Sequence, residues 1–68
     1  MLGQSPSFAT SVKALRAKLG LSQEDLAKAL GVSFASVNRW ENGKTQPSKL
    51  AKNQFESFCQ KQKEQGRL

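Results

Sequence analysis

The segment QEDLAKALGVSFASVNRWEN, residues Gln23 to Asn42, decides the fold that we expect for this chain. It predicts two short helices joined by a tight turn at Gly31, because glycine adopts the left-handed conformation that ends a helix without a Cβ clash. Ala27 is small enough to let the second helix cross the first one closely. Val37 is a stiff apolar side chain that would face inward from the second helix.

The residues that flank these two helices carry matching start and stop signals. Ser22 and Asp25 form an acidic variant of the capping box before the first helix. Ser33 can cap the second helix, and Gly43 follows it as a second left-handed stop. Two consecutive helices with these signals have the layout of a DNA-reading helix-turn-helix, whose second helix lies in the major groove.

Apolar residues at helical spacing predict one helix before this unit and one after it. The earlier helix would be capped by Ser5 or Ser7 and would end at Gly20; its apolar stripe is Phe8, Val12, Leu15 and Leu19. The later helix would run from about residue 49 to 62 with Ser48 as its cap. Its expected inner residues are Leu50, Ala51, Phe55, Phe58 and Cys59. The sequence therefore predicts an all-α fold, a compact bundle of four short helices, or five if a fragment follows the last one.

The size and composition of the chain fit a single domain over residues 1–68, with an ordered core at about residues 7–60 and frayed ends. Cys59 is the only cysteine and histidine is absent, so we expect neither a disulfide nor a metal site, and no cofactor. No apolar run approaches the roughly 20 residues of a membrane span, and the first residues lack the pattern of a signal peptide. We expect a cytoplasmic protein without a membrane or small-molecule partner.

The chain is strongly basic, with 11 Lys and Arg residues against 5 Asp and Glu residues and a net charge of +6. Such an excess attracts nucleic acid or an anionic membrane surface, and it also fits a merely soluble cationic surface. The charge favours DNA because it coincides with a predicted reading helix.

A helical projection divides the helix expected at about residues 34–42 into two faces. With Val37 at the centre of the inner face, Trp40 and Glu41 also point inward at 100° per residue. The outer face and its flanks consist of Ala35, Ser36, Asn38, Arg39 and Asn42.

Four residues of this helix are candidates for contacts with DNA bases. Arg39 carries a fork of N–H donors that suits O6 and N7 of guanine, unless it is only a solvated surface arginine. Asn38 can pair with N6 and N7 of adenine or face solvent. Ala35 can touch a thymine methyl group; Phe34 can do the same or pack at the start of the helix.

A polar and basic rim around this helix is the candidate for contacts with the DNA backbone. The N–H groups at the start of both helices can hold phosphate oxygens. Residues just past the second helix lie where the backbone should run and would fix register without reading sequence. The candidate backbone-contacting residues are Gln23, Ser33, Ser36, Asn42, Lys44, Thr45 and Lys49.

Glu41 needs a partner, because a carboxylate on the inner side of a helix is costly to bury alone. Arg16 lies on the edge of the inward stripe of the first helix of the chain. We predict a structural Arg16–Glu41 ion pair that locks these two helices together. The alternative is that Glu41 tilts into solvent.

The stretch LGLSQEDLAKALGVSFASVNRWENGKTQPS strongly resembles the DNA-binding domains of the Cro/CI-type repressors, the XRE-like family with the lambda-repressor-like fold. The likeness covers about residues 11–58, and its most specific parts are LSQEDLA, LGVS and WENGK. It implies a helical domain that binds operator DNA, usually as a dimer on a two-fold symmetric site, and it supports the Arg16–Glu41 pair. It assigns phosphate contacts to Gln23, Asn42 and Lys44, and base contacts to Phe34, Ala35 and Arg39.

Two features depart from the pattern of this family. Many relatives place polar residues such as glutamine at the first two base-reading positions, where this chain has Phe34 and Ala35. Direct readout would then rest mainly on Arg39 and Asn38. Members commonly have five helices with dimer contacts near the last one, so the mode of dimerisation stays open.

These features predict a transcriptional regulator that binds double-stranded DNA sequence-specifically, with homodimerisation on the DNA as one option. The alternative is a protein-interaction or antitoxin-like module with the same fold, which would expose an apolar patch at Phe34, joined by Phe55 and Phe58 if the last helix packs loosely. An enzyme is not expected, and we assign no catalytic residue: histidine, paired carboxylates and a phosphate-cradling glycine loop are absent.

Overall fold

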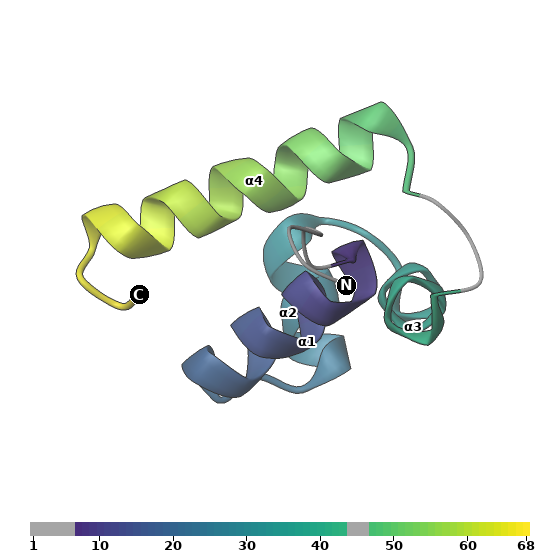
Figure 1. Ribbon diagram of the computed structural model, residues 1–68, viewed down its shortest axis with the longest axis horizontal. Coiled ribbons are helices and arrows are strands. Elements are labelled where there is room, and N and C mark those ends of the chain that lie inside the picture. Colours follow the sequence, from purple (N-terminus) through teal and green to yellow (C-terminus); the bar gives the residue numbers. More distant parts are fainter. Residues whose placement is uncertain (1–6, 44–46) are drawn as a thin grey trace, which may run out of the picture.

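Four α-helices make up most of the part of the chain that the structure describes, residues 7–43 and 47–68 of a computed structural model (Figure 1). They are α1 (Phe8–Leu19), α2 (Gln23–Leu30), α3 (Phe34–Asn42) and α4 (Lys49–Glu64). The described residues contain no strand, which confirms the predicted all-α fold. α2 and α3 begin and end at the residues that the sequence predicts.

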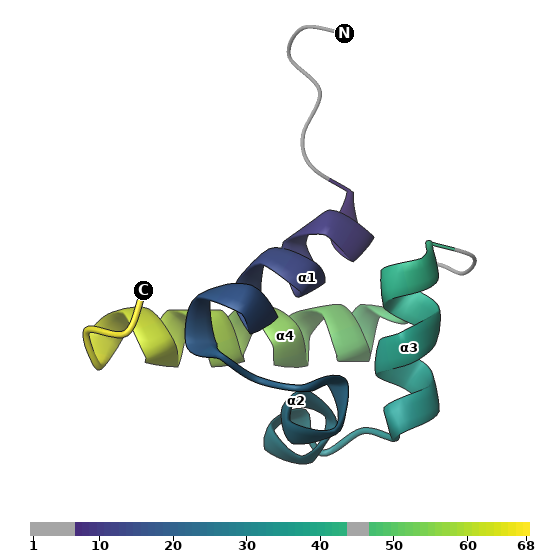
Figure 2. The same cartoon turned by 90° about the horizontal axis from the view of Figure 1, so that it is seen from below.

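The arrangement of the helices leaves α3 at one edge of the molecule. α3 packs against both α1 and α2, and α4 packs against α2. In both ribbon views α3 lies nearer to the N-terminal end of α4 than to its C-terminal end, which extends far from α3 (Figure 1 and Figure 2). One side of α3 is therefore held by two neighbouring helices, and the opposite side faces outward.

The core takes apolar side chains from all four helices. Val12 of α1, Leu26 of α2 and Val37 of α3 are completely buried. Phe8 makes edge-on ring contacts with Trp40 and Phe55, with centroids 5.4 and 5.2 Å apart, and so links α1 to α3 and α4. The core cluster is Val12, Leu15, Leu26, Ala27, Leu30, Val37, Trp40 and Phe55. The predicted inward positions of Ala27, Val37 and Trp40 are confirmed.

Serine caps explain where the four helices begin, and left-handed glycines explain where α1, α2 and α3 end. The capping residues are Ser7, Ser22, Ser33 and Ser48. Ser22 Oγ accepts a hydrogen bond from the backbone N–H of Asp25 at 3.0 Å, and the Asp25 carboxylate accepts one from the backbone N–H of Ser22 at 3.2 Å, which confirms the predicted capping box. Gly31 and Gly43 end α2 and α3 in the left-handed conformation, with φ of 73° and 70°.

The prediction that Leu50 belongs to the inner side of α4 is wrong. Its side chain is 69% exposed, whereas Phe55 is buried and Ala51, Phe58 and Cys59 pack against the core. Leu50 and Phe55 are five positions apart, which places them about 140° apart around the helix. Apolar character alone predicts an inner position for Leu50, but its angular position on the helix is out of phase with the inner stripe.

The end of α4 also differs from the prediction. The helix continues to Glu64 rather than ending near residue 62. Gln62 is only 7% exposed, although the tail carries no apolar stripe. The backbone N–H of Arg67 donates to the carbonyl oxygen of Gln62 at 2.8 Å, and Arg67 Nη1 lies 3.5 Å from the side-chain oxygen of Gln62. A polar residue, which hydrophobic patterning does not reveal, therefore helps to close this end of the helix.

Replacing Gly31 by alanine should destabilise the domain by about 1–2 kcal/mol, because a left-handed backbone costs an L-residue that much. A Cβ at Gly31 would meet no atom within 4 Å, so the cost would come from the backbone alone. Gly31→Asn is the matched control and should lose less, since asparagine tolerates this conformation better. Urea unfolding followed by circular dichroism measures both variants. A Gly31→Ala variant as stable as the wild type would contradict this explanation of the turn.

Candidate nucleic-acid interface

α3 presents two chemically different faces. Val37, Trp40 and Glu41 are buried against the rest of the domain. Ala35, Arg39 and Asn42 are exposed, and Ser36 and Asn38 are half-buried on the flanks. This distribution matches the two faces that the helical projection predicts, so the candidate base-contacting side chains share one outward surface.

Phe34, the first residue of α3, is an exposed aromatic side chain. It is 53% exposed, and it takes no part in the core packing of the described residues. The other aromatic residues, Phe8, Trp40, Phe55 and Phe58, belong to the core or pack against it. Of the two roles that the sequence leaves open for Phe34, packing at the start of the helix would leave its side chain outside the core, and contact with a thymine methyl group stays a prediction.

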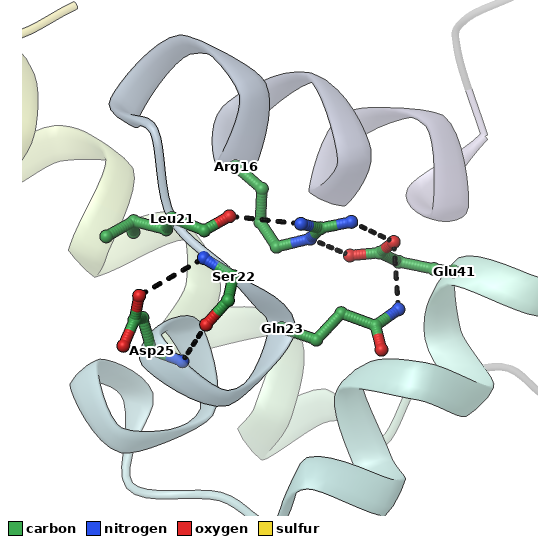
Figure 3. Close-up of polar contacts among 6 residues, drawn as sticks. All are labelled: Arg16, Leu21, Ser22, Gln23, Asp25 and Glu41. Carbon is green, nitrogen blue, oxygen red and sulfur yellow. Dashed lines mark hydrogen bonds and ion pairs between the residues drawn. The ribbon is translucent and has the colours of Figure 1, made fainter.

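A buried carboxylate joins α1, α2 and α3 (Figure 3). Glu41 of α3 is 5% exposed. Arg16 of α1 donates from Nε to Glu41 Oε2 and from Nη2 to Glu41 Oε1, the second at 2.8 Å, and its Nη1 donates to the carbonyl oxygen of Leu21 at 3.0 Å. Gln23, the first residue of α2, donates from Nε2 to Glu41 Oε1 at 3.1 Å. Glu41 does not tilt into solvent, the alternative that the sequence left open.

These contacts fix the charge state of the pair. The hydrogen bonds from Arg16 hold the pKa of Glu41 below its ordinary value, against the opposing effect of burial. The hydrogen bond from Gln23 and the positive charges of Arg16 and Lys13 lower this pKa further. The same pairing raises the pKa of Arg16. Glu41 is the only acidic residue of α3, and its charge is neutralised inside the domain, so the outer face of α3 carries no carboxylate.

Gln23 has a contact that sequence reasoning missed. The phosphate contact expected of this side chain stays a prediction, and its amide nitrogen also donates one hydrogen bond to Glu41. An amide nitrogen carries two N–H donors, so one of them remains for a second acceptor. The contact with Glu41 orients the amide at the start of α2. No pattern within the sequence signals this contact, because it forms only when α3 lies across the start of α2.

The other candidate backbone-contacting residues differ in the hydrogen bonds that they make within the protein. Ser33 Oγ accepts from the backbone N–H of Ser36 at 3.1 Å, and the two serine hydroxyls lie 3.0 Å apart in a hydrogen bond. Asn42 and Lys49 are exposed. Lys44 and Thr45 lie outside the described residues. Within the described part, the rim therefore combines side chains already bonded within the protein with side chains exposed to solvent.

An open hollow of about 470 Å³ lies beside the outer face of α3. Ser36 and Arg39 line it from α3, and Ser48 and Leu50 line it from the start of α4. The first turn of α4, which begins with Lys49, therefore borders the same surface as Arg39. No sequence pattern signals this hollow, because it depends on how α4 passes α3.

Other kinds of site find little support in the described residues. Within residues 7–43 and 47–68, no three His, Cys, Asp or Glu side chains gather where they could hold a metal ion. Cys59 is half-buried, and burial raises the pKa of its thiol, which disfavours the reactive thiolate. None of the helices in this part of the chain is both long enough and apolar enough to cross a bilayer. The outer face of α3 is thus the strongest candidate surface.

The fold and this surface define a small helical domain with a helix-turn-helix at α2 and α3. A family profile described as helix-turn-helix matches residues 12–50, more than half of the chain. The chain belongs to this helix-turn-helix family, the Cro/CI-type DNA-binding domains. Membership confirms the resemblance and supports the expectation that the domain is not an enzyme.

Curated relatives share part of the same sequence. The "Uncharacterized HTH-type transcriptional regulator YiaG" of Escherichia coli strain K12 is 44% identical over 39 residues, which are 57% of this chain and 41% of that protein. Proteins of the same name from E. coli O6:H1 and O157:H7 match to the same extent. The matched segment thus covers less than half of each relative. No solved structure matches the chain.

Removing the guanidinium of Arg16 should cost about 3 kcal/mol of unfolding free energy, because Arg16→Ala leaves the buried Glu41 carboxylate without its main partner. Lys18→Ala is the matched control, since it removes an exposed positive charge from the same helix and should change stability by less than about 0.5 kcal/mol. Urea unfolding compares the two. Equal stability of both variants would show that the ion pair contributes nothing to the fold.

The depressed pKa of Glu41 should also appear as a pH dependence of stability. A carboxyl group whose folded pKa lies below its unfolded value stabilises the fold above the unfolded value, and this contribution is lost as the pH falls through the folded pKa. Glu41→Gln should therefore be less stable than the wild type at pH 7, with the difference shrinking in acid. Urea unfolding over a series of pH values measures this. A difference that stays constant down to pH 2 would contradict the assignment.

Proposed function

We propose that this domain binds double-stranded DNA sequence-specifically, with α3 in the major groove, as part of a transcriptional regulator. The proposal rests on the outer face of α3. Arg39 is exposed on this face, Asn38 is half-buried at its flank, and the face carries no carboxylate. Membership of a DNA-binding family and the net charge of +6 support the same partner.

Arg39 is the main base-contacting residue in this proposal. Its side chain is exposed, and no carboxylate in the described part of the chain forms an ion pair with it. Its fork of donors is therefore available for O6 and N7 of guanine, while Asn38 can pair with adenine on the flank. Ala35 lies one turn before Arg39, and its small side chain allows the helix to approach the bases closely.

Contacts with the DNA backbone would position α3 without reading sequence. In this proposal Gln23 uses its remaining N–H on a phosphate oxygen, while its other N–H stays on Glu41. The exposed Lys49 at the start of α4 and Asn42 at the end of α3 contact phosphates on the neighbouring rim. The same role is proposed for Ser33, Ser36, Lys44 and Thr45.

A tight specific site would need more than one copy of the domain. A single module of this size buries about 600–1,000 Å² of protein surface on DNA, which is small for a tight complex. We propose a homodimer whose two copies read half-sites about 34 Å apart on a two-fold symmetric operator. DNA as the partner also supports the expected cytoplasmic location.

The rival function, a protein-interaction or antitoxin-like module, has weaker support. An exposed apolar patch around Phe34, Phe55 and Phe58 would indicate this function. Phe55 is buried and Phe58 packs against the core, which leaves only Phe34 of that set exposed. The rival remains an outcome of the following test.

A salt titration on duplex DNA tests the proposed function. With about four to six phosphate contacts per monomer, the logarithm of the binding constant should fall against the logarithm of the salt concentration with a slope of about −4 to −5. Fluorescence anisotropy on a site selected from a random duplex pool gives this slope. A flat salt dependence, or a pool that yields no preferred sequence, would contradict the proposal and favour the interaction module.

The division of roles predicts different effects for two exposed cations. Arg39→Ala should weaken binding to the selected site by about 1–3 kcal/mol and relax the preference at one base pair. Lys49→Ala should weaken selected and random DNA alike and reduce the salt slope by about one. Lys63→Ala is the charge-matched control, because it lies in the last turn of α4, far from α3 (Figure 2). Identical effects of all three variants would show that net charge alone binds the DNA.

A further inference from the structure

Two adjacent apolar residues form the N-terminal end of α3. Phe34 and Ala35 are its first two residues, and both are exposed. Phe34 is 53% exposed, whereas the other aromatic side chains all contribute to the core or pack against it. A large apolar side chain in solvent costs free energy in the isolated domain, since about 0.8 kcal/mol is gained for each CH₂ group that is buried. Phe34 therefore has contact area that the fold itself does not use.

The position of this apolar pair limits what can cover it. It lies at the N-terminal end of the helix whose outer face carries Arg39, and the first residues of a recognition helix approach the base edges most closely. Neither side chain can donate or accept a hydrogen bond. The major groove offers one apolar feature among its donors and acceptors, the methyl group on C5 of thymine. 5-Methylcytosine carries the same group on the same ring atom.

We infer that Phe34, with Ala35 beside it, contacts the 5-methyl group of a pyrimidine, so that the domain distinguishes thymine and 5-methylcytosine from uracil and unmodified cytosine. This inference rests on the proposed function, because it requires α3 to enter the major groove. It adds a base determinant that hydrogen bonding cannot supply. It also makes binding sensitive to cytosine methylation wherever a methylated cytosine occupies that position.

The test removes single methyl groups from the DNA rather than from the protein. Each thymine of the selected site is replaced in turn by uracil, which keeps the base pair and loses only the methyl group. Wild-type binding, measured by fluorescence anisotropy, should weaken about fourfold at one or two positions, the equivalent of about 0.8 kcal/mol for one buried methyl group. At the same positions, a cytosine–guanine pair should bind more tightly when its cytosine carries a 5-methyl group.

The protein variants show whether Phe34 is responsible. Phe34→Ala should bind thymine and uracil sites within twofold of each other at those positions, whatever its overall affinity, and circular dichroism checks that it is folded. Leu68→Ala is the matched control: it truncates another exposed apolar side chain, at the end of the chain far from α3, and should keep the wild-type ratio (Figure 1 and Figure 2). The ratio of two sites on one variant cancels any general loss of affinity.

The outcomes separate this inference from the proposed function. A selected site with a steep salt dependence and no uracil sensitivity at any thymine would overturn the methyl contact while leaving DNA binding intact. Uracil sensitivity that persists in Phe34→Ala would assign the methyl contact to another residue and overturn the role of Phe34. Absence of a selected site would remove the proposed function together with this inference.

Discussion

The carboxylate of Glu41 is the constraint on which the arrangement of the other helices around α3 depends. It is buried, and it is neutralised by Arg16 of α1 and bonded by Gln23 of α2. A lone buried charge would be costly, so the contacts with both partners favour this orientation over one that buries Glu41 unpaired. Because Val37 and Trp40 share that inner side, the same orientation turns Ala35 and Arg39 outward. The ion pair and the burial of Val37 and Trp40 thus favour the same orientation, which leaves the opposite surface of α3 free.

Much of the fold follows from local signals in the sequence. Serine caps and left-handed glycines fix the bounds of α2 and α3, because each acts on backbone groups within one turn of the helix end. The two faces of α3 follow from helical periodicity for the same local reason. The ion pair of Arg16 was also predictable, since a glutamate on an inner face needs a cation and α1 offers one at the edge of its stripe.

The features that sequence reasoning missed depend on how separate helices meet. Gln23 bonds to Glu41 only because α3 crosses the start of α2, and the hollow beside Arg39 exists only because α4 passes α3. Leu50 is apolar, but its angular position on α4 lies outside the inner stripe and leaves it exposed. Gln62 is a buried polar residue that hydrophobic patterning ignores. The roles of the outward side chains on DNA follow from chemistry and family membership, and they stay predictions.

Isotope-edited NMR of the domain during titration with its selected duplex tests the central claim, that the outer face of α3 enters the DNA groove. The account predicts that the largest changes affect the side chains of Phe34 and Arg39 and the backbone amides at the start of α2. The side-chain signals of Trp40 and Arg16 should stay near their free positions, because the core and the ion pair are retained on binding. Changes concentrated on the C-terminal half of α4, with α3 unaffected, would contradict the account.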